Sequence, residues 1–263
     1  MTATSVSKKR RCLAGLVIAG LAFAASAEEP AERPAVDPEA IAILHRALDP
    51  LSAAKSLRVK TRKLYDVVQP SGQKLQFGTW DTAVLRRPDR AAVEIEQDDG
   101  RKRHVYYDGE TLTMHDVADG VYTRFPVPTT LDETLDFLEL EVGATMPLAD
   151  LFYSDLSPLG AAATEAIVVG TSRVGDWSCD HLAFRRESID YQLWVEQGDA
   201  PRLRKLVITY RELPGAPQFG AVFASWELGV DAPDALFEFS PPEGVDRIPT
   251  LARPRGLATE DPR

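Results

Sequence analysis

The sequence predicts a mainly β protein of the α+β class, in which a few helices cover one face of a strongly curved antiparallel sheet. Three observations predict this fold class. Between residues 57 and 239, apolar and polar residues alternate in short segments separated by turn-forming residues, as in antiparallel strands. One helical segment precedes these strands and a second interrupts them. About twelve strands are more than a flat open sheet usually sustains, so we expect strong curvature.

Residues 1–27 have the three parts of a secretory signal peptide. Basic residues at 8–11 precede an apolar run at 13–24, and Ala25-Ser26-Ala27 supplies the small residues for cleavage after Ala27. The apolar run is shorter than the about 20 residues of a membrane-spanning helix, so we expect no stable transmembrane anchor. The sequence therefore predicts export to a bacterial periplasm and leaves the Sec and twin-arginine routes open.

Composition limits the partners of the exported chain. Four of the 30 basic residues and none of the 40 acidic ones lie in residues 1–27, which leaves a net charge of −14 on the rest. This charge argues against nucleic acid and against anionic membrane surfaces as partners. Cys179 is the only cysteine after residue 27, so no intrachain disulfide is possible and the apolar core must hold the fold. We expect a monomer.

The chain after the signal peptide predicts one domain with short extensions. Residues 28–36 are rich in proline and glutamate, which predicts a flexible leader. The domain spans residues 37–249. Residues 250–263 contain few apolar side chains and predict a loose C-terminal tail.

The domain begins with an amphipathic helix. Asp37 is a predicted N-cap and Pro38 a favourable first helical residue, while Ile41, Leu44 and Leu48 share one face. We expect this helix to end near the Asp49-Pro50 pair.

Two runs of six strands come next, joined by turns rich in aspartate, glycine and proline. The first run is expected at residues 57–68, 75–85, 91–97, 102–107, 111–117 and 121–125. The second run is expected at residues 166–174, 177–184, 189–195, 204–213, 219–228 and 236–239.

A second helix separates the two runs of strands. Thr130 is its predicted cap, apolar residues recur at helical spacing through residues 131–142, and Gly143 ends it. Its remaining positions are strongly acidic, so we expect its hold on the sheet to come almost wholly from its apolar stripe, which would make it a movable cover. The apolar segment 148–153 comes after it.

The hairpin around Glu187-Ser188 carries the most unusual mixture of side chains. A two-residue turn there places Phe184 opposite Tyr191, Leu182 opposite Leu193 and His181 opposite Trp194. One face is then apolar, and the other carries Cys179, His181, Gln192 and Trp194. We interpret this second face as either a candidate binding surface or a buried cysteine beside a hydrogen-bonded histidine. Thiol catalysis is disfavoured, because strand neighbours two apart lie about 6.6 Å from each other.

A second hairpin brings two histidines to one face. A turn at Asp108-Gly109 pairs His104 with Thr113 and Lys102 with His115, which places His104 and His115 diagonally. Two histidines are not a complete metal site, so we expect surface histidines and no metal. The opposite face of this hairpin is apolar and is expected to point to the interior, with Val105, Tyr107, Leu112 and Met114.

Five segments resemble a family of predicted periplasmic proteins that is known only as a domain of unknown function. They are Tyr107-Asp108-Gly109-Glu110-Thr111-Leu112, Met146-Pro147-Leu148-Ala149-Asp150-Leu151, Cys179-Asp180-His181-Leu182-Ala183-Phe184, Tyr191-Gln192-Leu193-Trp194-Val195 and Phe237-Glu238-Phe239-Ser240-Pro241-Pro242. The resemblance covers nearly the whole chain after residue 27. That family is similar in fold to the periplasmic carriers of outer-membrane lipoproteins, the LolA and LolB type. The resemblance implies a half-barrel whose concave face is covered by helices and holds acyl chains.

Together these observations favour an exported, non-enzymatic protein that binds a hydrophobic small molecule, a lipid or a lipidated protein, and that needs no cofactor. The expected apolar lining is Val105, Tyr107, Leu112, Met114, Leu135, Leu138 and Phe152. A sensor or interaction module with a filled interior and an exposed apolar patch is the first alternative. An enzyme is the second, although the sequence contains no phosphate-binding glycine loop, nucleophile elbow or zinc-protease histidine pair.

Overall fold

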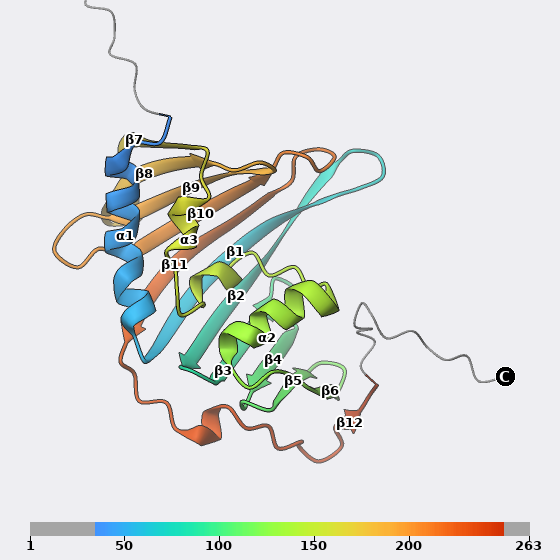
Figure 1. The fold of residues 1–263 in the computed structure, drawn as a ribbon. Helices are drawn as coiled ribbons and strands as arrows, with labels where there is room; N and C mark the ends of the chain where they lie inside the picture. The colour runs from blue at the N-terminus through green and yellow to red at the C-terminus, as the bar shows by residue number, and fades with distance from the viewer. Residues whose placement is uncertain (1–34, 250–263) are drawn as a thin grey trace, which may run out of the picture. The chain divides into compact units, whose positions relative to one another are not determined.

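The computed structural model describes residues 35–249 (Figure 1). The predicted signal peptide, residues 28–34 of the predicted leader and the predicted tail at 250–263 lie outside the described residues. The last two leader residues pair with the domain, because Val36 forms an isolated parallel bridge with Ala166.

Twelve strands form one open sheet in the order β12-β6-β5-β4-β3-β2-β1-β11-β10-β9-β8-β7. This is the expected curved half-barrel, not closed into a barrel, with the helices over one face (Figure 1). The strands of the first run are β1 (Ser56–Val68), β2 (Lys74–Arg86), β3 (Arg90–Gln97), β4 (Lys102–Tyr107), β5 (Thr111–Asp116) and β6 (Val121–Pro126). Those of the second run are β7 (Glu165–Val174), β8 (Trp177–Arg185), β9 (Ile189–Glu196), β10 (Leu203–Tyr210) and β11 (Gln218–Leu228).

The prediction of a strand at residues 236–239 is wrong. A short 3-10 helix, η3 (Asp234–Leu236), precedes it, and the twelfth strand is β12 (Asp246–Arg247), which pairs parallel to β6. Phe237 is fully buried and Phe239 packs on Tyr106, because this segment crosses a face of the sheet instead of extending its edge. The alternation that suggested a strand comes from these two packed rings.

The first helix, α1 (Pro38–Ala53), begins as predicted, with the Asp37 side chain accepting a hydrogen bond from the Glu39 backbone N–H. Its predicted end is wrong, because the helix continues through Pro50 to Ala53. Leu51 is only 1% exposed, so burial of this extra apolar residue favours the last turn although Pro50 donates no backbone hydrogen bond.

The predicted central helix is divided into two pieces. Thr130 caps α2 (Leu131–Phe137) by accepting from the Glu133 N–H, and a π-helical turn, η1 (Leu138–Val142), continues it. Gly143 ends the turn at φ 75°, as its place in the sequence predicts. Two further short pieces come after it, η2 (Ala149–Leu151) and α3 (Pro158–Ala161). We call residues 131–161 the cover.

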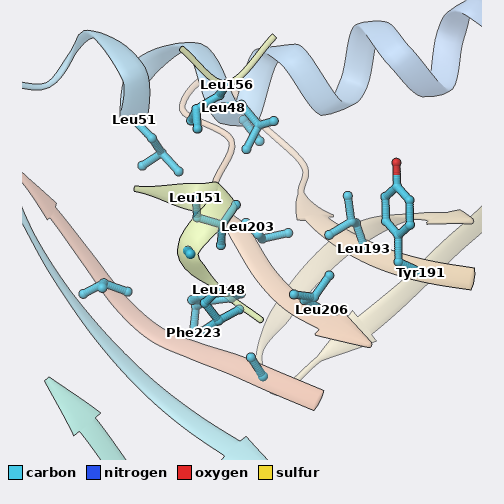
Figure 2. Close-up of a cluster of buried hydrophobic side chains, with 14 of the residues drawn as sticks. Leu48, Leu51, Leu148, Leu151, Leu156, Tyr191, Leu193, Leu203, Leu206 and Phe223 are labelled. Carbon is cyan, nitrogen blue, oxygen red and sulfur yellow. The ribbon is translucent and has the colours of Figure 1, made fainter. Parts of the chain in front are cut away.

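One apolar core lies between these helices and the sheet. Leu57, Leu85, Tyr107 and Leu112 stand in register across four strands and belong to the same buried cluster as α1 and α2. We call this side of the sheet the inner face and the opposite side the outer face. Figure 2 shows how α1, the cover and the strands of the second run converge, through Leu48, Leu51, Leu148, Leu151, Leu156, Tyr191, Leu193, Leu203, Leu206 and Phe223.

Candidate functional site

The predicted apolar lining is brought together on the inner face beside α2. Tyr107, Leu112, Leu135 and Leu138 are buried, and they join the partly buried side chains of Val105, Met114 and Phe152 in one apolar cluster. The Tyr107 hydroxyl donates to the Pro128 carbonyl oxygen, so its polar atom is satisfied inside the core. These residues are packed side chains in the described conformation, and their role as ligand contacts stays a prediction.

An apolar cavity lies elsewhere on the inner face, between α1, the cover and the strands β9 and β10. Its volume is about 50 Å³, which is room for a few water molecules and is far below the roughly 300–1,000 Å³ of a small-molecule site. Its walls are almost wholly apolar and include Leu44, Leu48, Leu151, Leu193, Leu206 and Ile208. In the described conformation this cavity is therefore too small for a lipid.

Polar contacts tie the cover to itself and to the sheet. The Arg87 guanidinium donates to the carbonyl oxygens of Phe152 and Tyr153, at 2.6 and 2.9 Å. Within the cover, the Tyr153 hydroxyl donates to Asp136, and burial together with this hydrogen bond raises the pKa of Tyr153. Arg87, which follows β2, therefore holds residues 152 and 153 of the cover by polar contacts, whereas the almost wholly apolar hold of residues 131–142 stays a prediction.

The inner face continues beyond the cover as an exposed apolar patch. Two cross-strand pairs of the β1–β2 hairpin, Tyr65 with Phe77 and Val67 with Leu75, form it. These four side chains are 37–44% exposed. The rings of Tyr65 and Phe77 stack with centroids 6.0 Å apart. We call these four residues the hairpin patch.

A buried ion pair separates the hairpin patch from the core. The Lys63 ammonium contacts the Asp81 carboxylate, and the Thr79 hydroxyl donates to the same carboxylate at 2.5 Å. The Asp81 side chain is only 4% exposed, whereas that of Lys63 is 26% exposed. Sequence reasoning missed this pair. Its signal was present, because Lys63 and Asp81 occupy inward positions of strands whose other inward residues are largely apolar.

The β8–β9 hairpin has the predicted register, with Leu182 opposite Leu193, His181 opposite Trp194 and Phe184 opposite Tyr191. His181 Nε2 lies 2.9 Å from Gln192 Oε1, and the imidazole stacks on Trp194 with ring centroids 4.2 Å apart. The predicted register, which places His181, Gln192 and Trp194 on one face, is confirmed.

Cys179 lies on the same hairpin and is fully buried. Its thiol donates a weak hydrogen bond to the Trp177 carbonyl oxygen. Burial, and after it the negative charge of Glu196, raises the pKa of the Cys179 thiol. A buried, protonated thiol is a poor nucleophile, which agrees with a structural role.

The predicted register of the two histidines is wrong. His104 lies directly opposite His115 instead of diagonal to it, because the turn residues are Gly109-Glu110. The Asp108 carboxylate accepts from the N–H groups of both Glu110 and Thr111, which shifts the turn by one residue.

The predicted exposure is also wrong for one histidine, because His115 is buried at 7% exposure beneath the ring of Phe239. Burial, and after it His104, lowers the pKa of His115. Across residues 35–249, no group of three or more His, Cys, Asp or Glu side chains could hold a metal ion.

A larger groove lies on the outer face, between the sheet and the segment that carries η3. Its volume is about 560 Å³, and its walls mix charged and apolar side chains. Arg58, Lys60, Glu94, His104, Tyr106 and Glu238 are among its lining residues. This groove is open and carries charged side chains among apolar ones, so it differs from the almost wholly apolar cavity of the inner face.

Within the part of the chain that the structure describes, no helix is long and apolar enough to cross a membrane.

Solved structures with a similar chain path come from several bacteria. LprF of Mycobacterium bovis has a TM-score of 0.50 at 12% identity, over 76% of this chain and 98% of that one. Lipoprotein LppX of Mycobacterium tuberculosis has a TM-score of 0.46 at 16% identity, over 74% and 98% of the two chains. A LolA superfamily protein of Nitrosomonas europaea has a TM-score of 0.34 at 13% identity, over 76% and 97%. At these identities the likeness to LprF shows the fold alone.

No curated protein sequence matches this chain. A family model does match it, over residues 40–251, under the description predicted periplasmic protein (DUF2092). Because that match spans most of the sequence, the chain belongs to the DUF2092 family of predicted periplasmic proteins.

Proposed function

We propose that this protein is an exported binding protein that takes up an apolar ligand, such as a lipid or acyl chain, between the inner face of the sheet and the cover. The observation that carries the proposal is the apolar cavity of about 50 Å³ beneath the cover. Its walls come from α1, the cover and the strands β9 and β10, so movement of the cover alone would enlarge it.

The construction of the cover supports such movement. Its helical pieces are seven, five, three and four residues long. Helices this short have little stability of their own, and packing must hold them in place. A few leucine contacts, each contributing about 1.5–3 kcal/mol when fully buried, would then set the free energy of opening.

Hydrogen exchange tests whether the cover opens. Amides of residues 131–142 are expected to exchange faster than those of β4, and to slow when an apolar ligand is added. If the cover is as protected as β4 and no lipid or hydrophobic probe changes its exchange, the cover does not open to admit a ligand and the proposal is contradicted.

Native mass spectrometry of protein purified from the periplasm of its own host tests the ligand itself. A stoichiometric lipid, identified after extraction, is the expected result. The same sample tests export, because we propose cleavage after Ala27 and the mature chain should then begin at Glu28. Retention of Met1 in the functional protein would contradict export by cleavage.

A second candidate function has its own observation in its favour. The small volume of the apolar cavity and the exposed hairpin patch suit an interaction module that binds a peptide or an envelope protein. Crosslinking from residue 77 in the periplasm distinguishes the two functions. Larger side chains in place of Leu48 and Leu151 would fill the cavity that these residues line. A protein adduct that persists in such a variant would favour the interaction module.

A further inference from the structure

The ion pair of Lys63 and Asp81 has no counterpart among the neighbouring inward positions. Toward the core, the next cross-strand pair on the inner face beyond Thr61 and Asp81 is apolar, Val59 with Ala83. Toward the hairpin tip, the next pair is Tyr65 with Phe77. Small-molecule sites are typically apolar surfaces with a few polar groups that fix orientation, and this is the arrangement here.

Lys63 and Asp81 differ in the hydrogen-bonding capacity that remains available to a ligand. One carboxylate oxygen of Asp81 accepts from the Thr79 hydroxyl, and the other is buried against the Lys63 ammonium with no hydrogen-bond partner, so neither is open to a ligand. The Lys63 ammonium carries three N–H donors, and Asp81 is the partner that the described residues give it. Because Lys63 is also the more exposed of the two, the free hydrogen-bonding capacity is cationic.

The apolar surface beside Lys63 gives the ligand its second property. From Lys63 toward the hairpin tip, two successive apolar pairs lie at steps of about 6.6 Å each, a strip of about 13 Å. Between residues 67 and 77 the only charged side chain is Lys74, whose ion-pair partner Asp66 alternates with the strip residues Tyr65 and Val67 and so lies on the outer face.

We propose that the inner face selects a single-chain amphiphile with an anionic head group, a carboxylate or a phosphate, bound by Lys63, with its chain along the hairpin patch. Asp81 is the counter-ion of Lys63 at the end of the strip, and a bound anionic head group competes with it for the ammonium. The inference rests on the proposed function and specifies its ligand class, at a strip of the inner face that lies beyond the cover and apart from the cavity beneath it.

Dodecanoate and dodecanol are the test pair, because they share one chain length and differ in head-group charge. The exported chain should bind dodecanoate about tenfold more tightly than dodecanol, the effect of one charge-assisted hydrogen bond. Lys63→Met should remove that difference and leave dodecanol binding unchanged, and Lys63→Arg should restore part of it. Lys60→Met is the matched control, since Lys60 lies on the same strand but on the outer face.

Two further variants sharpen the test. Asp81→Asn removes the carboxylate that competes for Lys63, so dodecanoate should bind more tightly, the opposite of what a purely stabilising ion pair predicts. Phe77→Ser should weaken both ligands alike by removing part of the strip.

The outcomes separate the two proposals. Equal binding of both ligands, unchanged in Lys63→Met, would contradict the proposed selection of an anionic head group and leave the apolar binding function intact. Binding of neither ligand to the unmodified chain would contradict the binding function itself.

Discussion

The two structures that cover the inner face, helix α1 and the cover, differ in how they are held. Six residues of α1 are 0–4% exposed, whereas Leu131, Leu135 and Leu138 of the cover are 5–9% exposed. The helix α1 is one regular α-helix of 16 residues, whereas the cover is α2 continued by the π-helical turn η1, followed by two short pieces, η2 and α3, joined by irregular backbone. This difference indicates that α1 belongs to the rigid body of the domain. Opening of the cover would break fewer closely packed contacts than displacement of α1.

The largest expected effect is a difference between two leucine truncations. Leu48→Ala in α1 should lower the free energy of unfolding by about 2–5 kcal/mol, because it leaves a cavity in a closely packed wall. Leu138→Ala in the cover should cost less than about 2 kcal/mol, since its surroundings can relax. Urea denaturation of both variants measures this difference, and equal losses would show that the cover is as rigid as α1.

Removal of the Arg87 side chain should loosen the cover alone. Arg87→Met deletes two charge-assisted hydrogen bonds to the carbonyls of Phe152 and Tyr153, worth about 1–3 kcal/mol together. Hydrogen exchange should then speed up at residues 131–154 and stay unchanged in β8. Arg58→Met on the outer face is the control, and a uniform increase across both regions would indicate global destabilisation instead.

The accessibility of the Cys179 thiol tests whether the sheet around it stays closed in the native protein. Its thiol is fully buried and its pKa is raised by burial, so thiol reagents at mildly alkaline pH should modify it only on unfolding. Cys179→Ser should cost about 1–3 kcal/mol, because it buries a hydroxyl in place of a thiol, and should leave ligand binding intact. Rapid labelling of the native protein, or loss of binding in a folded Cys179→Ser variant, would mean that the thiol has a functional role.

The smallest effect concerns the hydrogen bond from Tyr153 to Asp136 inside the cover. The pKa of Tyr153 is raised, so its stabilisation is fully present below the ordinary tyrosine pKa of about 10 and is lost as the pH rises toward the raised value. Tyr153→Phe should weaken the closed cover by less than about 1 kcal/mol at neutral pH and remove this alkaline dependence. A pH series of cover exchange, corrected for intrinsic rates, compares the two proteins; identical alkaline profiles would exclude this contribution.

Local chemistry predicted the elements whose signals lie within a few residues. The N-caps at Asp37 and Thr130, the end of the central helix at Gly143 and the β8–β9 register all result from side chains beside the backbone they fix. Where two local signals competed, the sequence was less decisive. At Asp108, the side-chain bonds to Glu110 and Thr111 shifted the turn by one residue and changed the histidine pairing.

By itself, the sequence determined the fold class and the antiparallel order of the first six strands, because alternation and turn residues specify hairpins locally. Only the tertiary structure decided the features that depend on contacts distant in sequence. The alternation around Phe237 is the same in a strand and in a segment that packs its rings against a sheet, and the contact of Phe239 with Tyr106 settles which one occurs. Likewise, Lys63 and Asp81 meet because the register of β1 on β2 places them on one face, and no pattern along either strand alone specifies that pairing.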